Sequence, residues 1–359
     1  MAAAGLAQCL SHRLVPRTLQ TWLLYRKDKP GCCRYYRAAI CRKLKDPLAI
    51  EEVPSRPIQP DEVRVDVHFC GVNFADILTC RGRYQESPPL PFTPGIELAG
   101  QVMETGTNVS TVKEGDRVIS VINFNTMAEQ CIVDQKKLWQ IPEGVSYQEA
   151  AALPVCYGTA ILALEQRART QPGETVLVTA AAGATGLALI DVASNILQAK
   201  VIAAAGSDEK CKLALQRGAK SAVNYSRGNM KEELKKLTGG QGVNVVIEAV
   251  GGDVCLAALH SLAWEGRMVV IGFAGGSILS IPSNLLLVKN TSVMGIYSTR
   301  YLKENFPLFS KYMSSILQYC QEGSIKPHIG RIFKLEEINE AFEHVTQRKT
   351  TGKVILSVK

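Results

Sequence analysis

The sequence predicts an α/β protein built from two domains, a β-rich unit followed by a doubly wound parallel sheet. The chain has 359 residues, a length that suggests two domains or three. Short stretches of strand character, separated by Gly and Pro, extend to about residue 140. From residue 175 onward buried strands alternate with helices, which is typical of a parallel sheet covered on both faces.

The β-rich unit is predicted from alternation and from turn residues. Residues 63–69 alternate apolar and polar side chains with a period of two, which indicates a half-buried strand. Turn-forming residues then recur at short intervals, at Gly71, Gly82, Pro88, Pro89, Pro91, Pro94, Gly95, Gly100, Gly106 and Gly115. We therefore expect a unit made mostly of β-strands in this part of the chain.

The second unit is expected to begin with a helix at Ser146. Ser146 and Glu149 have the spacing of a capping box, and the helix should run over 150–167 with a break or kink at Pro154. Apolar strands are expected at 175–179, 201–205, 221–225, 243–249, 268–273 and 292–296, with helices between them, the first over 187–197. A helix over 302–321 and a strand over 353–358, which should return to the β-rich unit, are expected to close the chain.

Composition excludes several classes of function. Hydrophobic residues make up 46% and charged residues 21% of the chain, an ordinary globular balance that excludes whole-chain disorder. The net charge of +8 is concentrated in residues 1–45, which hold ten Lys and Arg and one Asp. Residues 46–359 are therefore nearly neutral, and we expect no nucleic-acid partner.

The first segment has the composition of a targeting sequence. Residues 1–27 contain no acid, two early Arg and six Leu, as in organelle transit peptides. We therefore expect residues 1–35 to be a mitochondrial presequence; the alternative is a disordered basic tail on a cytoplasmic protein. No apolar run approaches the ~18 residues that a membrane span needs, so no membrane span is expected.

A glycine-bearing turn over residues 180–186 indicates a dinucleotide site. It lies between a predicted strand and a predicted helix and has the pattern A-x-x-G-x-x-G. Small residues let the main chain approach a pyrophosphate, whose charge is favoured at the start of the helix. The cofactor-binding residues predicted here are Ala180, Gly183, Ala184, Thr185 and Gly186.

The end of the second strand of this unit favours NADP(H). An NAD site usually has an acid there for the ribose hydroxyl, whereas this strand ends in small neutral residues as far as Ser207, with Lys210 shortly beyond. A cation at this place suits a 2′-phosphate. In the alternative, Lys210 lies in solvent and Asp208 or Glu209 binds the ribose of NAD(H).

Several ordered motifs carry a family resemblance. They are GVNFAD at 71–76, GRY at 82–84, PGIELAG at 94–100, GDRV at 115–118 and TGKV at 351–354. Together they resemble the medium-chain dehydrogenase/reductase family from about residue 38 to the end. Within it the chain is similar to the zinc-free quinone oxidoreductases, close to zeta-crystallin, and the run 284–290 points to a narrower group among them.

The resemblance implies a GroES-like catalytic domain and a Rossmann NADP(H)-binding domain inserted into it. The implied boundaries are 36–155 and 297–359 for the catalytic domain and 156–296 for the Rossmann domain. By the same resemblance, Asn73, Asp76 and Tyr84 are the expected catalytic residues. Further cofactor contacts are expected from Thr159, Ser207, Lys210, Tyr225 and Arg348.

The resemblance also implies an enzyme without zinc. Asn73 and Ile96 stand where zinc alcohol dehydrogenases of the family have a Cys and a His. No set of four closely spaced Cys occurs between Cys80 and Cys131 to form the structural zinc lobe. Without a Lewis acid, a simple alcohol is a poor substrate, whereas a conjugated acceptor can spread the incoming charge onto its own oxygen.

The function expected from these observations is reduction of quinones or related α,β-unsaturated carbonyls with NADPH. Two alternatives stay open: an enoyl-thioester or alkenal reductase on the same fold, and a nucleotide-binding protein with little turnover. A homodimer through the edge strand near 292–296 is the habit of the resembled family and is expected here.

Overall fold

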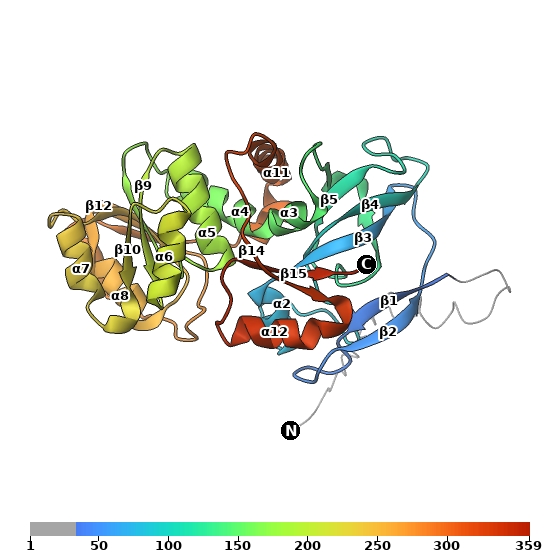
Figure 1. The fold of residues 1–359 in the computed structure, drawn as a ribbon, viewed down its shortest axis with the longest axis horizontal. Coiled ribbons are helices and arrows are strands. Elements are labelled where there is room, and N and C mark those ends of the chain that lie inside the picture. Colours follow the sequence, from blue (N-terminus) through green and yellow to red (C-terminus); the bar gives the residue numbers. More distant parts are fainter. Residues whose placement is uncertain (1–33) are drawn as a thin grey trace, which may run out of the picture.

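The computed structural model describes residues 34–359 and holds two large β-sheets and a small two-stranded sheet (Figure 1). The predicted presequence therefore lies almost wholly outside the described residues. One large sheet belongs to a β-rich domain formed by both ends of the described chain, and the other large sheet belongs to a parallel-sheet domain formed by its middle.

The β-rich domain is built on a seven-stranded sheet. Its strands follow the order β14-β15-β3-β4-β5-β7, and β6 pairs with β3 off this path. A separate two-stranded sheet packs nearby. The bounds are β1 Tyr35–Ile40, β2 Ala49–Pro54, β3 Glu62–Val72, β4 Glu97–Thr105, β5 Arg117–Val121, β6 Gln130–Asp134, β7 Leu138–Gln140, β14 Ile329–Lys334 and β15 Lys353–Ser357.

The parallel-sheet domain holds six strands in the order β10-β9-β8-β11-β12-β13. All five pairings are parallel, as the alternation of strands and helices predicts. The bounds are β8 Thr175–Val178, β9 Lys200–Ala205, β10 Ser221–Asn224, β11 Val243–Glu248, β12 Leu262–Val270 and β13 Ser292–Gly295.

Both faces of this parallel sheet are buried. Val176 and Val178 belong to the hydrophobic core on one face, and Leu177 between them belongs to the core on the other. Successive side chains of a strand point to opposite faces, so an uninterrupted apolar run serves two layers of helices. The helices of this domain are α5 Ala184–Asp191, α6 Asp208–Gln216, α7 Met230–Leu237, α8 Gly252–His260 and α9 Ser283–Lys289.

The helices that join the domains begin at the predicted capping box. Ser146 Oγ accepts from the Glu149 N–H, and Glu149 accepts from the Ser146 N–H. Pro154 then divides the helical stretch into α3 Tyr147–Ala152 and α4 Pro154–Ile161, because proline fits the first turn of a helix but not its interior. The predicted break at this residue is confirmed.

One helix was not predicted and another was predicted as a single element. The first is α2 Phe74–Cys80, which directly follows Val72 in a unit that is otherwise mostly β, as expected. The helix predicted over 302–321 is two helices, α10 Tyr301–Glu304 and α11 Phe306–Gln321, separated at Asn305, whose side chain accepts from the N–H of Leu308 and so starts the second helix.

The closing strand returns to the β-rich domain as expected. After α12 Ile338–Thr346, β15 inserts between β14 and β3 and pairs antiparallel with β3, with Val354 opposite Val72. Just before it, Gly352 forms a parallel bridge with Gly183 of the parallel-sheet domain. The strand that completes one sheet therefore also contacts the other domain.

Candidate active site

Asn73 and Asp76 lie at the start of α2, where β3 ends. Asn73 precedes the helix in extended conformation, and its main-chain N–H donates to the Asp76 carboxylate over 2.8 Å. Only 8% of Asn73 and 2% of Asp76 is exposed. Asp76 therefore caps its own helix, whereas the Asn73 side chain is directed to the neighbouring strands.

The Asn73 side chain belongs to a buried polar network with Glu97 and Lys353. Asn73 Nδ2 donates to Glu97 Oε1 over 2.8 Å, and Lys353 Nζ donates to Asn73 Oδ1 over 2.7 Å. Lys353 Nζ also pairs with Glu97 Oε1 at 2.5 Å. The pairing of β15 with β3 and of β3 with β4 brings these distant residues together.

Glu97 and Lys353 were not among the predicted site residues. Both belong to motifs of the family resemblance, PGIELAG and TGKV, which was the only signal that could have singled them out. An acid at the start of one strand and a Lys at the start of another do not by themselves indicate that the two side chains form a pair.

The pKa of Asp76 lies close to neutral pH. Burial raises the pKa of this carboxyl to about 7, against the lowering effects of the Asn73 N–H and of the Lys353 ammonium. Asp76 is therefore a group at this site that can change its charge in the physiological range.

Tyr84 lies in the loop after α2 and faces Tyr297 of the segment that follows β13. The two rings meet edge to face with centroids 6.2 Å apart. Burial, and then the contact with the Tyr297 hydroxyl, raise the pKa of Tyr84 well above its ordinary value. The Tyr84 hydroxyl therefore keeps its proton at neutral pH and can act as a hydrogen-bond donor.

Thr159 contacts Ser298, the residue that follows Tyr297. Its Oγ1 lies 2.8 Å from Ser298 Oγ. Residues 297–298 thus face Tyr84 of the β-rich domain with one side chain and Thr159 of α4 with the next. Sequence reasoning placed Tyr84 and Thr159 at the site but missed Tyr297 and Ser298.

The predicted glycine turn joins β8 to α5. Ala180, at the first position of the pattern, has a φ of +48°, a conformation that favours glycine. Gly186 allows the helix to approach the strand, because a Cβ there would lie 2.4 Å from the Ala180 carbonyl oxygen. Gly183, Ala184 and Thr185 are partly exposed at the start of α5.

This turn fits an anionic group. The first N–H groups of a helix lack partners within the helix and carry partial positive charge, and small residues leave the main chain accessible there. The turn also lies against β15, since the Gly352 N–H donates to the Ala182 carbonyl over 2.9 Å.

The structure brings together four of the predicted cofactor contacts near the end of β9. Ser207 Oγ accepts from the Lys210 N–H at the start of α6, and Lys210 Nζ donates to the main-chain carbonyl of Arg348 over 2.7 Å. Tyr225 lies over the strand end, where a Cβ on Gly206 would be 3.3 Å from its hydroxyl oxygen. Within residues 34–359, neither Lys210 nor Arg348 forms an ion pair with an acid.

The acids considered for an NAD ribose have other surroundings. Asp208 accepts from Asn224 Nδ2 over 2.8 Å and pairs with Arg227 at 2.5 Å. Glu209 is exposed. Asp208 is therefore already paired with a cation, whereas Lys210 and Arg348 near the end of β9 have no acid partner among the described residues.

Glu248 is a further buried acid at the strand ends of the parallel sheet. It terminates β11, and its carboxylate accepts from the N–H groups of Val250 and Gly251 over 2.8 and 3.1 Å. It also accepts from Thr179 Oγ1 over 3.2 Å. Glu248 thus fixes the turn after β11 beside the end of β8, a role that sequence reasoning did not assign.

Asn73 and Ile96 stand where the zinc alcohol dehydrogenases resembled by this chain have a Cys and a His. Among residues 34–359, no group of three or more His, Cys, Asp and Glu could hold a metal ion. At Asn73 the two polar atoms of the side chain already bind Lys353 and Glu97.

A membrane-spanning helix was not expected from the sequence. Among the helices of residues 34–359, none is long and apolar enough to cross a membrane.

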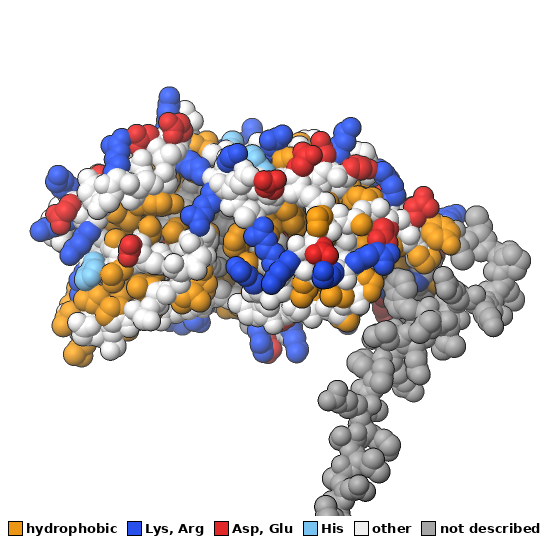
Figure 2. Space-filling view, turned by 90° about the horizontal axis from the view of Figure 1, so that it is seen from below, with side chains coloured by type: hydrophobic (Ala, Val, Ile, Leu, Met, Phe, Trp, Pro, Cys, Tyr) orange, Lys and Arg blue, Asp and Glu red, His pale blue; other side chains and the backbone are white. Residues whose placement is uncertain are grey.

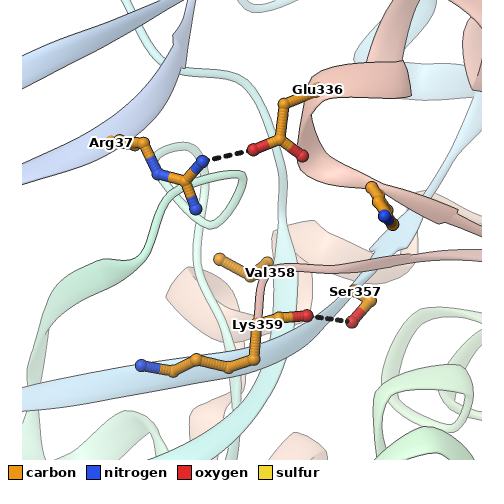
Figure 3. A pocket seen from close by; sticks show the side chains of 6 residues that line it. Arg37, Glu336, Ser357, Val358 and Lys359 are labelled. Atoms are coloured by element: carbon orange, nitrogen blue, oxygen red, sulfur yellow. Dashed lines mark hydrogen bonds and ion pairs between the residues drawn. The ribbon is translucent and has the colours of Figure 1, made fainter.

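A cavity of about 450 Å³ lies away from these residues, at the end of β15 (Figure 3). Arg37 crosses it to pair with Glu336, and the Ser357 hydroxyl donates to the Lys359 carbonyl. Lys334 and Val358 complete the lining. None of the predicted site residues takes part, so this cavity is separate from the candidate active site.

The two domains and the groups at their junction indicate a class of protein, the oxidoreductases that use a dinucleotide cofactor. Residues 59–163 match the family described as "Alcohol dehydrogenase GroES-like domain", and residues 184–315 match "Zinc-binding dehydrogenase". The chain belongs to the medium-chain dehydrogenase/reductase family.

Among curated relatives, the chain is 70% identical to "Quinone oxidoreductase-like protein 2" of Bos taurus over 340 residues, which cover 95% of this chain and 97% of the relative. Among solved structures it is similar to the quinone oxidoreductase of Thermus thermophilus, described also in complex with NADPH, with a TM-score of 0.80 and 34% identity, covering 90% of this chain and all of that one. The Escherichia coli quinone oxidoreductase complexed with NADPH has a TM-score of 0.80 and 28% identity, covering 90% of this chain and 99% of that one.

Proposed function

We propose that the protein is a zinc-independent reductase that uses NADPH to reduce a quinone or a related α,β-unsaturated carbonyl. The observation that carries the choice of cofactor is the pair of cations at the end of β9. Lys210 and Arg348 lie together without an acid partner in the described residues, and burial followed by the charge of Arg348 lowers the pKa of Lys210. A 2′-phosphate supplies the negative charge that such a pair lacks.

The residues that would hold the dinucleotide fit its chemistry. The start of α5, with Gly183, Ala184 and Thr185, suits the pyrophosphate, and Lys210 and Arg348 suit the 2′-phosphate. When bound, this cofactor supplies a hydride. The protein contributes orientation of the acceptor and exclusion of competing reactions.

Tyr84 is the proposed proton donor to the reduced acceptor. Its raised pKa keeps the hydroxyl protonated at neutral pH, and the Tyr297 hydroxyl faces it. A conjugated acceptor needs only one proton at the oxygen that receives the charge, so a single positioned hydroxyl suffices.

Zinc independence is supported by the residues at the positions where zinc alcohol dehydrogenases have ligands. Lys353 already places a positive charge against Asn73 and Glu97, and a second cation there would be repelled. A Lewis acid at this point would also need ligands that Asn73 and Ile96 do not provide.

One assay tests the proposal against its alternatives. The purified chain is mixed with NADPH and, separately, with a quinone, an enal and an enoyl thioester, and NADPH consumption is followed. Turnover highest with the quinone supports the proposal. A preference for the thioester or the enal would indicate the alternative reductases, and NADPH binding without turnover would indicate a nucleotide-binding protein.

We also propose that the protein forms a homodimer through the edge strand of the parallel sheet. Within the described residues, β13 is an edge strand that pairs only with β12. Trp264 of β12 and Leu287 and Val288 of α9 are more than 60% exposed. Figure 2 shows apolar side chains in patches over this domain. Light scattering tests the dimer.

We also propose a mitochondrial location, from the basic, acid-poor composition of the first segment. A reporter fused to residues 1–35 tests the location, and a diffuse cytoplasmic signal would contradict it.

A further inference from the structure

The ammonium group of Lys353 is among the most deeply buried charges of the described residues. Its side chain is 3% exposed, and the Glu97 side chain that pairs with it is fully buried. Burial alone would lower the pKa of Lys353, but the facing Cys156 and Glu97 raise it, so the ammonium stays charged. A buried ion pair is costly to form, and it need not stabilise the fold more than apolar residues would.

The contacts of the Lys353 ammonium are with buried protein groups. It donates to Asn73 Oδ1 and pairs with Glu97 Oε1, and its side chain is 3% exposed, so it is shielded from a reactant. The lysine can therefore influence chemistry only through the residues that it holds.

The network determines which way the Asn73 amide points. An ammonium donates only and a carboxylate accepts only, so the oxygen of Asn73 must face Lys353 and its NH₂ group must face Glu97. Glu97 Oε2 accepts from the Val155 N–H over 2.8 Å, which fixes the carboxylate in turn. One N–H of the Asn73 side chain is then left over in a fixed direction.

The main chain beside Lys353 is attached to the glycine turn. Gly352 bridges to Gly183, and the Gly352 N–H donates to the Ala182 carbonyl. The lysine side chain holds Asn73, and the preceding residue holds the turn that suits the pyrophosphate. These two contacts set the distance between the two halves of the candidate site.

We propose that Lys353 and Glu97 are positioning residues for the reductase reaction. They hold the Asn73 amide so that its remaining N–H is presented to a carbonyl oxygen of the reactants. This inference rests on the proposed function for the identity of the reactants. It also gives the buried ion pair a role in orientation beyond that of stability.

The test compares the two single variants Lys353→Met and Glu97→Gln with the double variant. Each single change leaves a buried group without its partner, so the melting temperature should fall on the order of 10 °C. The double variant removes both charges and should regain most of that loss. Its kcat should nevertheless stay about 10- to 100-fold below wild type, because the Asn73 amide is no longer oriented. The Kd for NADPH should change less than about threefold, since neither residue is a predicted cofactor contact.

A second ion pair provides the matched control. Arg267 and Glu174 pair at 2.7 Å in the parallel-sheet domain, with side chains 22% and 18% exposed. The side-chain hydrogen bonds of these two residues go to each other, to Ala168, to Asn244 and to Gln171, none of which is a predicted site residue. Arg267→Met with Glu174→Gln should show the same pattern of melting temperatures while kcat per folded protein stays at the wild-type value.

A spectroscopic readout separates this proposal from the proposed function. With ¹⁵N-asparagine labelling, the side-chain signal lost in Asn73→Asp identifies Asn73. That signal should move in the double variant and should move in wild type when NADPH is added. Full recovery of both melting temperature and kcat in the double variant, or an Asn73 signal unchanged by it, would overturn the positioning role. Absence of turnover in wild type with every acceptor would overturn the proposed function alone.

Discussion

The Lys210 ammonium donates to the main-chain carbonyl of Arg348 over 2.7 Å, which ties the start of α6 to the segment before β15. Arg348 itself has a φ of +56°, and its guanidinium donates to the Gly275 carbonyl over 3.2 Å. Residues from three distant parts of the chain thus meet here, and the charge of Arg348 contributes to lowering the pKa of Lys210. This arrangement is the physical basis of the expected preference for NADPH.

Lys210→Ala should weaken NADPH binding about ten- to a hundredfold and leave NADH binding almost unchanged. Only NADPH has the 2′-phosphate, and a hydrogen bond to a charged group contributes about 1.5–3 kcal/mol. Titration of both cofactors by fluorescence measures the effect. Lys212→Ala, an exposed position on the same helix, is the control. Equal losses for both cofactors would place the phosphate site elsewhere.

Tyr84→Phe should lower kcat at least tenfold while the Kd for NADPH stays the same. The change removes the hydroxyl that is proposed to donate the proton, and general acid catalysis of this kind contributes about 10²–10⁴-fold. Steady-state kinetics with a quinone, in H₂O and D₂O, measures the loss. Tyr319→Phe on α11 serves as control. A kcat unchanged in Tyr84→Phe would mean that the proton comes from elsewhere.

Asp76→Asn should change how stability depends on pH. The pKa of Asp76 is raised from 3.8 to about 7 on folding, so the folded state binds the proton more tightly. The resulting stabilisation is complete below about pH 4 and is lost as the pH rises through about 7. Wild type should therefore lose on the order of 2 kcal/mol more than the variant between pH 5 and 8.

Urea unfolding at the two pH values measures this difference. The exposed Asp46→Asn is the control and should behave as wild type. Parallel curves for wild type and Asp76→Asn would show that Asp76 is ionised throughout this range.

Ala180→Gly should raise the melting temperature by about 1–4 °C. A non-glycine residue in the left-handed region costs roughly 1–2 kcal/mol, and part of that gain is offset by the greater freedom of glycine in the unfolded chain. Calorimetry of the variant beside Ala181→Gly tests the reasoning, since Ala181 is buried without a positive φ and should lose stability. A lower melting temperature for both would show that the Ala180 methyl group contributes packing that outweighs its strain.

Elemental analysis of the purified chain after washing with chelator should find no stoichiometric zinc. The prediction follows from Asn73 and Ile96 at the ligand positions and from the ammonium of Lys353 between Asn73 and Glu97. About one zinc per chain would contradict it.

Local patterns in the sequence were sufficient for much of the fold. The capping box at Ser146, the break at Pro154 and the glycine turn at Gly183 each depend on neighbours within a few residues, and each lies where it was expected. The split at Asn305 was missed because an apolar period continues across it, while the cap there competes with the helix.

The candidate site was predictable only in part, because much of it depends on pairing between remote strands. The contact of Lys353 with Asn73 spans 280 residues, and no periodicity in either segment records it. Tyr297 gave no signal either, since a tyrosine after a strand is ordinary until the fold sets it against Tyr84. The positions near Lys210 were named from the family resemblance, and their grouping in space follows from the order of the strands.

The late return of β15 has a consequence for the synthesis of the protein. During synthesis β3 is made long before β15, the strand that pairs with it. Lys353, which binds Asn73, is added 280 residues after Asn73. The parallel-sheet domain, by contrast, has all six strands as soon as residue 295 has emerged. We expect this middle domain to acquire its fold first, and the incomplete β-rich sheet, with an open edge, to be the part that chaperones protect until translation ends.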